Sequence, residues 1–260
     1  MAASIEQGDG VPPGLPPVCV VTVCRNALAD LRLTAASVRQ QTYPQLHYLV
    51  VDGASSDGTP AFLRAAGDDI DDWVTEPDGG IYDAMNKAIQ RCPTNSWVVF
   101  LNAGDRFADD NVLQRLAGRL VDGVDMVFGG VAVRSAGGAA RPHRAGPVGT
   151  SKMPGCHQSM LVRAALLVRH RFDTGFKVGA DFEFYLRATR AGARVALFDG
   201  VVAEVAPEGF SAANEDILQH DYSRAITLHR GRRQALLWLA ARKCRRALHR
   251  LRLSVSQGPV

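Results

Sequence analysis

Residues 97–105 read Trp-Val-Val-Phe-Leu-Asn-Ala-Gly-Asp, an apolar run that stops at an amide, a small turn and a carboxylate. The apolar part is typical of a buried strand, and in open α/β sheets ligands bind at the carboxyl ends of the strands. Asp105 therefore stands where its carboxylate could contact a ligand. An aspartate here is also typical of a turn or a helix cap, because residues 109–120 have a helical pattern.

Two other polar stretches also follow apolar runs. Residues 22–26 read Thr-Val-Cys-Arg-Asn, and residues 52–59 read Asp-Gly-Ala-Ser-Ser-Asp-Gly-Thr. The second stretch has carboxylates that can accept hydrogen bonds from a base or a ribose, and glycines that let the backbone approach a ligand. Asp57 and Thr59 are equally typical of a turn that caps the next helix, so both interpretations stay open.

Residues 76–90 combine a glycine pair with an amphipathic helical pattern. The polar face of the expected helix over 81–90 carries Asp83, Asn86 and Lys87. The glycines at 79 and 80 would leave backbone N–H groups open to an anion or a sugar oxygen. Alternatively, Asp83 and Lys87 form an i,i+4 ion pair of about 0.3 kcal/mol on a solvated face.

The elements that must position these residues alternate along the chain. Apolar runs at 18–24, 46–51, 72–75 and 96–101 predict strands, and helical patterns separate them. This alternation predicts an open, mostly parallel α/β sheet flanked by helices and buried on both faces. Ligands bind at the carboxyl ends of strands in such sheets, where the three polar stretches stand.

The second half of the chain has a weaker alternation. Strands are expected near 125–135, 159–163 and 193–205, a flexible loop over 135–146, and a helix over 181–191. These elements would extend the sheet and not form an independent core.

Composition limits the classes of function. The chain has 260 residues, of which 47% are hydrophobic, enough for one large domain or two small ones. Neither a Gly-x-Gly-x-x-Gly turn after the first strand nor a P-loop occurs, which argues against dinucleotide oxidoreductases and P-loop NTPases. Five cysteines without Cys-x-x-Cys spacing argue against a disulfide framework and a zinc site, and favour a cytoplasmic location.

The two ends of the chain differ from the middle. Residues 1–17 are rich in glycine and proline and predict a flexible leader, and no apolar run approaches the roughly 18 to 20 residues that span a bilayer. Residues 222–260 contain ten Lys or Arg and no Asp or Glu, within a net charge of +4.

The basic tail over 222–260 has apolar residues at helical spacing from Gln234 onward. A basic amphipathic helix over 232–252 can lie on an anionic membrane surface. The helix could instead pack on its own domain with solvated arginines, or form a nucleic-acid patch. No nucleic-acid recognition motif accompanies it, so we expect no nucleic-acid partner.

Six stretches in this order resemble the family 2 glycosyltransferases, which have the GT-A nucleotide-sugar-binding fold. The resemblance runs from about Val18 to Ser211 and implies one GT-A domain over 18–221, with a nucleotide-binding half (18–105) and an acceptor or catalytic half (106–221). The stretches Gly-Ile-Tyr-Asp-Ala-Met-Asn-Lys and Cys-His-Gln-Ser look like bacterial members that build surface polysaccharides or glycolipids. The six stretches are Thr22 to Asn26, Val51 to Thr59, Gly80 to Lys87, Phe100 to Asp105, His157-Gln158 and Gly179 to Asp181.

The resemblance implies a role for each matching residue. Asp52 would hold the base, commonly uracil, and His157 and Gln158 would lie near the acceptor or the diphosphate. Asp105 would hold Mn²⁺ or Mg²⁺, although Asn102 and Gly104 stand where the family usually has acids. The residues expected to bind the nucleotide and donor are Thr22, Arg25, Asn26, Asp52, Asp57, Asp83, Asn86, Lys87 and Asn102.

Catalysis would need a base that deprotonates the acceptor hydroxyl, and Asp181 matches the family's base position. Asp181 could also be the N-cap of the following helix, a role compatible with catalysis. Glu183 is a backup base only. Residues 207–211 resemble a loop that closes over the donor and excludes water.

The sequence thus predicts an inverting, metal-dependent glycosyltransferase. It would move a sugar from a nucleotide-diphosphate donor, UDP-linked, to a glycan, lipid-linked or glycolipid acceptor at the inner face of the plasma membrane, as a peripheral protein. One alternative is a non-catalytic assembly subunit that binds nucleotide sugar. Another is a nucleotidyltransferase, which the lack of a loop rich in glycine and lysine after the first strand disfavours.

Overall fold

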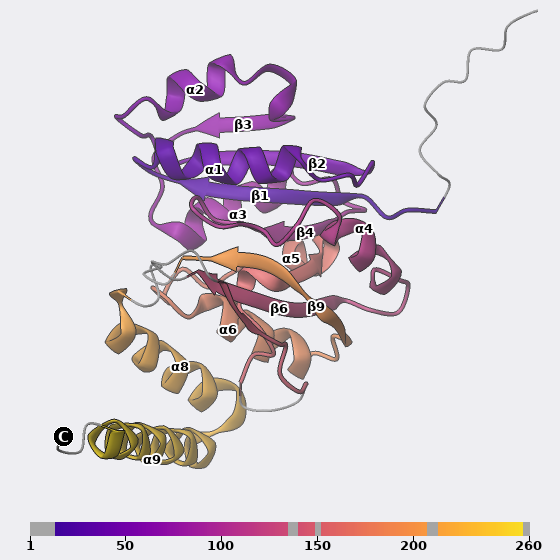
Figure 1. Cartoon of the computed structure of the whole chain (residues 1–260). Coiled ribbons are helices and arrows are strands. Elements are labelled where there is room, and N and C mark those ends of the chain that lie inside the picture. The colour runs from indigo at the N-terminus through magenta and orange to yellow at the C-terminus, as the bar shows by residue number, and fades with distance from the viewer. Residues whose placement is uncertain (1–13, 135–139, 149–151, 207–212, 257–260) are drawn as a thin grey trace, which may run out of the picture.

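The computed structural model describes residues 14–134, 140–148, 152–206 and 213–256. Most of the leader expected at 1–17, and the whole loop expected at 207–211, lie outside these residues. The described residues form one nine-stranded sheet with helices on both faces (Figure 1). The order along the sheet is β3-β2-β1-β4-β8-β6-β9-β5, and β7 pairs with β6.

The first half of the sheet is parallel, as predicted. Its strands are β1 (Val18–Cys24), β2 (Leu46–Asp52), β3 (Asp72–Thr75) and β4 (Trp97–Phe100), and they pair in parallel in the order β3-β2-β1-β4. Helical crossovers impose this direction. The crossover helices are α1 (Leu28–Arg39), α2 (Thr59–Ala65) and α3 (Ile81–Arg91), with a short 3₁₀ turn, η1 (Gly67–Asp69), before β3.

The second half of the sheet is mixed. β8 (Met160–Arg163) is antiparallel to β4 and to β6 (Met126–Arg134), β6 is parallel to β9 (Val195–Val205), and β5 (Arg106–Phe107) is antiparallel to β9. The shorter helices here are α4 (Val112–Leu116), η2 (Ala117–Arg119), η3 (His157–Ser159) and α5 (Ala164–Arg169).

The loop expected over 135–146 contains a strand, so that prediction was partly wrong. β7 (Ala140–His143) pairs antiparallel with β6. Its sequence, Ala-Arg-Pro-His, has no alternation of apolar and polar residues, and most of it is exposed. Proline is tolerated on an edge strand, and backbone pairing with β6 holds this segment without a side-chain signal.

Two hydrophobic cores lie on the two faces of the sheet. α1 packs on one face with Leu31, Ala35 and Val38, beneath Trp97 of β4. α3 and α6 (Ala180–Arg190) pack on the other face. The strands of the first half are buried on both sides, which is why they read as continuous apolar runs.

Two long helices end the described chain. α8 (Glu215–Arg230) packs against α6, and α9 (Arg232–Ser256) follows after a turn at Gly231 (Figure 1). The ring of Tyr222 stacks on Phe182 at 4.2 Å between centroids and lies 6.1 Å from Trp238 of α9. The domain boundary expected at residue 221 therefore falls inside α8. Within the described residues, no helix is long and apolar enough to cross a bilayer.

Candidate functional site

A cavity of about 1020 Å³ opens at the carboxyl ends of β1 and β4. This is the edge at which ligands bind in open α/β sheets. The start of α3, the end of β6 and the 156–158 segment complete its wall. Of the predicted site residues, five line it: Arg25, Asn102, Asp105, His157 and Gln158. The other charged residues of the lining are Asp30, Asp78 and Arg134.

Asp105 is buried beside the cavity, with 7% of the residue exposed. Gln158 donates a hydrogen bond from Nε2 to its Oδ2 at 2.8 Å, and the backbone N–H of Ala206 donates to Oδ1 at 3.3 Å. Burial raises the pKa of the Asp105 carboxyl above its ordinary value, because removal from water disfavours the charged form. The carboxylate is therefore held in place, in a site where a cation would stabilise it.

Gly104, before Asp105, has a geometry that only glycine adopts without strain. Its φ is +94°, and a Cβ placed on it would lie 3.5 Å from Cγ of Asp30. Its N–H donates to Oγ1 of Thr34 at 3.0 Å, and Arg134 donates from a terminal guanidinium nitrogen to its carbonyl at 2.6 Å. A Cβ at 104 would make only ordinary van der Waals contact with Asp30. The positive φ is therefore the feature that disfavours a side chain at 104.

Asp30 and Arg134 were missed by sequence reasoning. They come from the first turn of α1 and the last residue of β6, about 70 and 30 residues from Gly104 in the chain. No local motif marks either residue. Only the placement of α1 and β6 around the end of β4 shows that they share this cavity.

A chain of polar contacts runs from the cavity to Asp181. Nδ2 of Asn102 lies 2.8 Å from Nε2 of His157, and Nδ1 of His157 lies 3.3 Å from Oδ2 of Asp181. The amide nitrogen can only donate, so Nε2 accepts and Nδ1–H donates to Asp181. The Tyr82 hydroxyl donates to Oδ1 of Asp181 at 3.3 Å. His157 thus stands between the carboxylate and the cavity, because Asp181 does not line it.

Asp181 is not the N-cap of α6, so that alternative was wrong. Gly179 is the N-cap, and Asp181 lies in the first helical turn with Oδ1 accepting the Phe182 N–H at 2.8 Å. The segment before α6 is fixed by Asp221, whose buried Oδ2 accepts three successive N–H groups. They are those of Lys177, Val178 and Gly179, at 2.8, 2.9 and 3.2 Å. α8 therefore supports the approach to Asp181.

Thr22 and Asp52 are fully buried and do not line the cavity. Thr22 donates to the carbonyl of Leu101 at 2.8 Å, which ties β1 to the end of β4. The Asp52 carboxylate accepts hydrogen bonds from the backbone and hydroxyl of Ser55. Both residues shape the strand ends beneath the site.

Asn26 and Asp57 stabilise the turns that follow β1 and β2, and they join these turns to each other. Asn26 has a φ of +50°, and its Oδ1 accepts the Ser56 N–H at 2.8 Å. Asp57 accepts the N–H groups of Thr59 at 2.9 Å and of Leu28 at 3.1 Å. Hydrogen bonds, first from Thr59, lower the pKa of Asp57. The contacts thus match the structural interpretation of Asp57, at the starts of α1 and α2.

The expectation of open N–H groups before α3 was wrong. The N–H of Gly79 donates to Oδ2 of Asp83, and that of Gly80 donates to Oδ1 of Asp78, both at 2.9 Å. Lys87 pairs with Glu76 at 3.0 Å. The chain's own carboxylates thus satisfy the groups that an anion would need.

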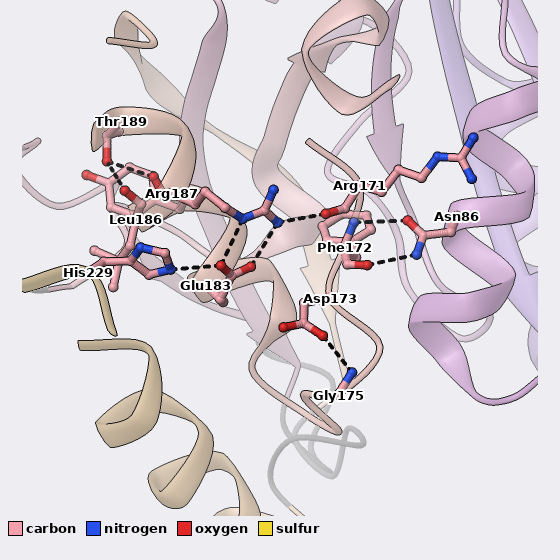
Figure 2. A network of polar contacts seen from close by, with 11 residues as sticks. Asn86, Arg171, Phe172, Asp173, Gly175, Glu183, Leu186, Arg187, Thr189 and His229 are labelled. Atoms are coloured by element: carbon pink, nitrogen blue, oxygen red, sulfur yellow. Dashed lines mark hydrogen bonds and ion pairs between the residues drawn. The ribbon is translucent and has the colours of Figure 1, made fainter. Parts of the chain in front are cut away.

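Asn86 does not line the cavity. Its amide brackets the backbone of Phe172, donating to the carbonyl at 2.9 Å and accepting the N–H at 3.0 Å (Figure 2). This pair of hydrogen bonds joins α3 to the segment before α6. The described contacts of Asn86 are structural.

Glu183 is engaged in a buried network, which contradicts its role as a backup base. Arg187 donates to both carboxylate oxygens at 2.8 and 2.9 Å, and Nε2 of His229 lies 2.8 Å from Oε1 (Figure 2). The Glu183 carboxylate thus joins α6 to α8. It does not line the cavity.

The residues present fit a divalent ion only in part. No group of three or more His, Cys, Asp or Glu side chains that could hold a metal occurs among the described residues. Asp105 offers a carboxylate, and the neighbouring Asn102 has a buried Oδ1 without a hydrogen-bond partner in the described chain. Both are oxygen ligands suited to Mg²⁺ or Mn²⁺. The set fits an ion that also takes oxygens from a bound ligand.

Sequence comparisons identify the chain's relatives. The family model for glycosyl transferase family 2 matches residues 19–181. An uncharacterized glycosyltransferase of Mycobacterium tuberculosis is 32% identical over 185 residues, which cover 66% of this chain and 69% of that protein. A PGL/p-HBAD biosynthesis glycosyltransferase of Mycobacterium bovis is 26% identical over 223 residues, covering 82% of this chain and 85% of that one.

Solved structures show the same fold. Residues 1–349 of Staphylococcus aureus TarS, in complex with UDP-GlcNAc, superpose with a TM-score of 0.65 at 16% identity, over 84% of this chain and 69% of that one. The mannosyltransferase PcManGT of Pyrobaculum calidifontis, with GDP-Man and Mn²⁺, gives 0.66 at 19%, over 94% and 81%. The fold is the mixed α/β fold of GT-A glycosyltransferases, as the resemblance implied. Because the family model matches more than half of the chain, the protein belongs to glycosyl transferase family 2 and is a glycosyltransferase.

Proposed function

We propose that the cavity at the ends of β1 and β4 binds a nucleotide-diphosphate sugar, UDP-linked, and that the enzyme transfers the sugar with inversion. The observation that carries the proposal is the convergence of Asp105 and the His157–Asp181 pair on one cavity. Its volume of 1020 Å³ suits a nucleotide sugar together with part of an acceptor. Donors bound to the fold neighbours, UDP-GlcNAc and GDP-Man, support the donor class.

Asp105 and Asn102 would hold a divalent ion, Mn²⁺ or Mg²⁺, together with the donor diphosphate. That ion would neutralise charge on the leaving diphosphate. The raised pKa of Asp105 supports the assignment, because a buried carboxylate without a strong cationic partner is stabilised by a bound cation. The hydrogen bond from Gln158 helps to fix the position of this carboxylate.

Asp181, predicted as the base, would act through His157, and His157 would be the group that takes the proton. An acceptor hydroxyl would replace the Asn102 amide at Nε2 of His157 and pass its proton to that nitrogen as the hydroxyl oxygen attacks the anomeric carbon. Asp181 holds the Nδ1–H and stabilises the imidazolium that forms, as a carboxylate does in other His–Asp pairs. The buried setting, with both side chains about one-tenth exposed, strengthens this interaction.

The acceptor is proposed to be a glycan or a lipid-linked glycan. Relatives whose names refer to PGL/p-HBAD and to teichuronic acid biosynthesis support a cell-surface polysaccharide or glycolipid. The basic helix α9 would place the enzyme, as a peripheral protein, on anionic lipid at the cytoplasmic face.

α9 has the two faces that such a placement needs. Ala235 and Trp238 are buried against the domain, so one face packs on the protein itself. Leu236 and Leu237 are 65% and 63% exposed, next to the exposed Arg232 and Arg233. Exposed leucines beside arginines are the arrangement by which an amphipathic helix binds anionic lipid.

The donor proposal is tested with a panel of UDP-, GDP- and dTDP-sugars, screened for thermal stabilisation with and without Mn²⁺. A ligand that binds the folded state raises the melting temperature by mass action. We expect a UDP-sugar to stabilise the protein, and Mn²⁺ to increase the effect. A panel in which no sugar nucleotide stabilises the protein would sink the proposal. Release of UDP then separates an enzyme from a non-catalytic binding subunit, and release of pyrophosphate from a nucleoside triphosphate would indicate a nucleotidyltransferase.

A further inference from the structure

Arg134 lies beside Gly104, the glycine at a position where the resemblance implies an acidic residue. It is the last residue of β6 and lines the cavity, and it donates to the carbonyl of Gly104 at 2.6 Å. Within the described residues, that carbonyl is the only hydrogen-bond partner of the Arg134 side chain. A guanidinium has five N–H donors in a fixed fork, so most of the donors of Arg134 remain for a ligand.

The described cavity lining carries three aspartates, Asp30, Asp78 and Asp105, and two arginines, Arg25 and Arg134, so its formal charge is slightly negative without a ligand. A diphosphate would therefore bind at this wall on Arg134 together with a cation. Arg134 is near enough to Asp105 to act on it electrostatically. Among the residues that the structure describes, Arg25 and Arg134 are the only Lys or Arg residues that line the cavity.

The two arginines differ in how they are held. Arg25 follows β1 and is exposed at the rim. Arg134 is half-buried and tethered to the turn that carries Asp105. A cation fixed before the ligand arrives loses less conformational freedom on binding than an exposed one. A fixed guanidinium is also well shaped for phosphate oxygens, which it can bind with two parallel hydrogen bonds.

We propose that Arg134 binds the diphosphate of the donor and supplies, from the protein, a positive charge that the acid-poor metal motif supplies only weakly. The inference rests on the proposed function, because it needs a nucleoside diphosphate at the end of β4. Arg134 then shares with the metal ion the neutralisation of the leaving diphosphate. Gly104 serves this role as well, because its carbonyl positions the guanidinium.

A purely structural role for Arg134 makes a different prediction. If the guanidinium only ties β6 to the 102–105 turn, its removal lowers stability and weakens every ligand of the cavity alike. If it binds diphosphate, its removal weakens ligands in proportion to their phosphates. The nucleoside without phosphate is the reference that separates the two roles.

The test is calorimetric binding of UDP and uridine, and of GDP and guanosine, to the full chain, with and without Mn²⁺. The variants are Arg134→Gln, Arg134→Lys and, as a control, Arg39→Gln. Arg39 is an exposed arginine paired with Asp69, outside the cavity. Melting temperatures of all variants show whether each is folded.

We expect Arg134→Gln to weaken the preferred diphosphate about tenfold or more, the effect of losing a charge-assisted hydrogen bond. The loss is larger without Mn²⁺, because Arg134 is then the main cation at the diphosphate. Nucleoside affinity stays unchanged, Arg134→Lys restores part of the diphosphate affinity, and Arg39→Gln matches wild type.

Two results would overturn the inference. One is a diphosphate affinity of Arg134→Gln equal to that of wild type, and the other is an equal loss for diphosphate and nucleoside. If wild type itself binds neither UDP nor GDP, with or without Mn²⁺, the proposed function fails, and the inference fails with it. Failure of the inference alone leaves wild-type binding intact.

Discussion

Nδ1 of His157 lies 3.3 Å from Oδ2 of Asp181, and both side chains are buried between α6 and the cavity wall. The contact makes His157 the cavity-facing member of the pair. In the proposed mechanism Asp181 acts on the substrate through the His157 imidazole. The two residues are 24 positions apart in the chain, so no local motif reveals the contact.

Asp181→Asn should abolish turnover while donor binding persists. The amide keeps the shape of the carboxylate but cannot stabilise a protonated His157, so we expect a fall in kcat of about 10³-fold. Steady-state rates of UDP release measure kcat, and calorimetry measures donor affinity. A variant that retains wild-type kcat would exclude Asp181 from the proton transfer. Asp173→Asn, outside the cavity lining, is the matched control.

Asp105→Asn should remove the Mn²⁺-dependent part of donor binding, since the amide offers no charge to the ion. In wild type, the pKa of Asp105 is raised by burial, so the folded state holds this proton more tightly than the unfolded chain. The group therefore contributes most stability at low pH, and this contribution is lost as the pH rises through the folded-state pKa.

Two measurements check the Asp105 prediction. Denaturant unfolding between about pH 4 and pH 7 should shift the difference in unfolding free energy in favour of Asp105→Asn as the pH rises. Mn²⁺-dependent stabilisation of wild type by donor should weaken on acidification, with a midpoint above the ordinary aspartate pKa. Identical Mn²⁺ dependence in wild type and variant would remove Asp105 from the metal site.

Gly104→Asp, which restores an acid to the motif, should destabilise the protein and not strengthen Mn²⁺ binding. A side chain at a φ of +94° is strained, although its Cβ would make only ordinary contacts with Asp30. We expect a loss of about 1–3 kcal/mol in the free energy of unfolding. Gly118→Asp is the control, because its φ is not positive and a Cβ there meets open space. Equal stability of the two variants would contradict the strain at Gly104.

Glu183→Gln should be strongly destabilising. It removes the charge that Arg187 and His229 contact in a buried site (Figure 2). Breaking such a buried network costs about 3–5 kcal/mol. The exposed pair Arg144–Asp199 provides the comparison, since Asp199→Asn should change stability by less than about 1 kcal/mol. Urea unfolding measures both, and similar effects in both variants would refute a structural role for the network.

Replacement of Leu236 and Leu237 by Gln should reduce binding to vesicles that contain anionic lipid. Both leucines are exposed on α9 beside arginines. We expect sedimentation with phosphatidylglycerol vesicles to fall several-fold and binding to neutral phosphatidylcholine vesicles to stay low. Leu33 of α1 is a similarly exposed leucine, and the Leu33→Gln variant should behave like wild type. Unchanged sedimentation of the double variant would dissociate α9 from the membrane.

The sequence predicted the first half of the fold well because each element there has a strong local signal. β1 and β3 have the predicted bounds, and β2, β4 and α3 differ by a residue or two. β7 could not be predicted, because it is held by backbone pairing with β6 and its side chains have no strand pattern. The bounds of α8 were not predicted for a related reason, because its buried contacts with α6 are spread over a largely polar helix.

The site was predicted in part. Arg25, Asn102 and Asp105, which follow strand ends, line one cavity with His157 and Gln158 of η3. The donor roles of Asp57, Asp83, Asn86 and Lys87 remain predictions, and their contacts in the structure are with the chain itself. A short motif cannot distinguish a carboxylate that waits for a ligand from one that caps a backbone N–H. That distinction depends on which neighbours the fold supplies.

The position of Asp221 determines where the chain can be truncated without loss of a buried contact. Asp221, whose carboxylate anchors the 177–179 segment, is the last residue of the expected domain. The next residue, Tyr222, stacks its ring on Phe182. A fragment that ends at 221 would keep the anchor of the 177–179 segment on a frayed helix end and would lose the ring. A fragment that keeps all of α8, through Arg230, retains both supports, so we expect the minimal folded unit to extend about half a helix beyond the boundary expected at 221.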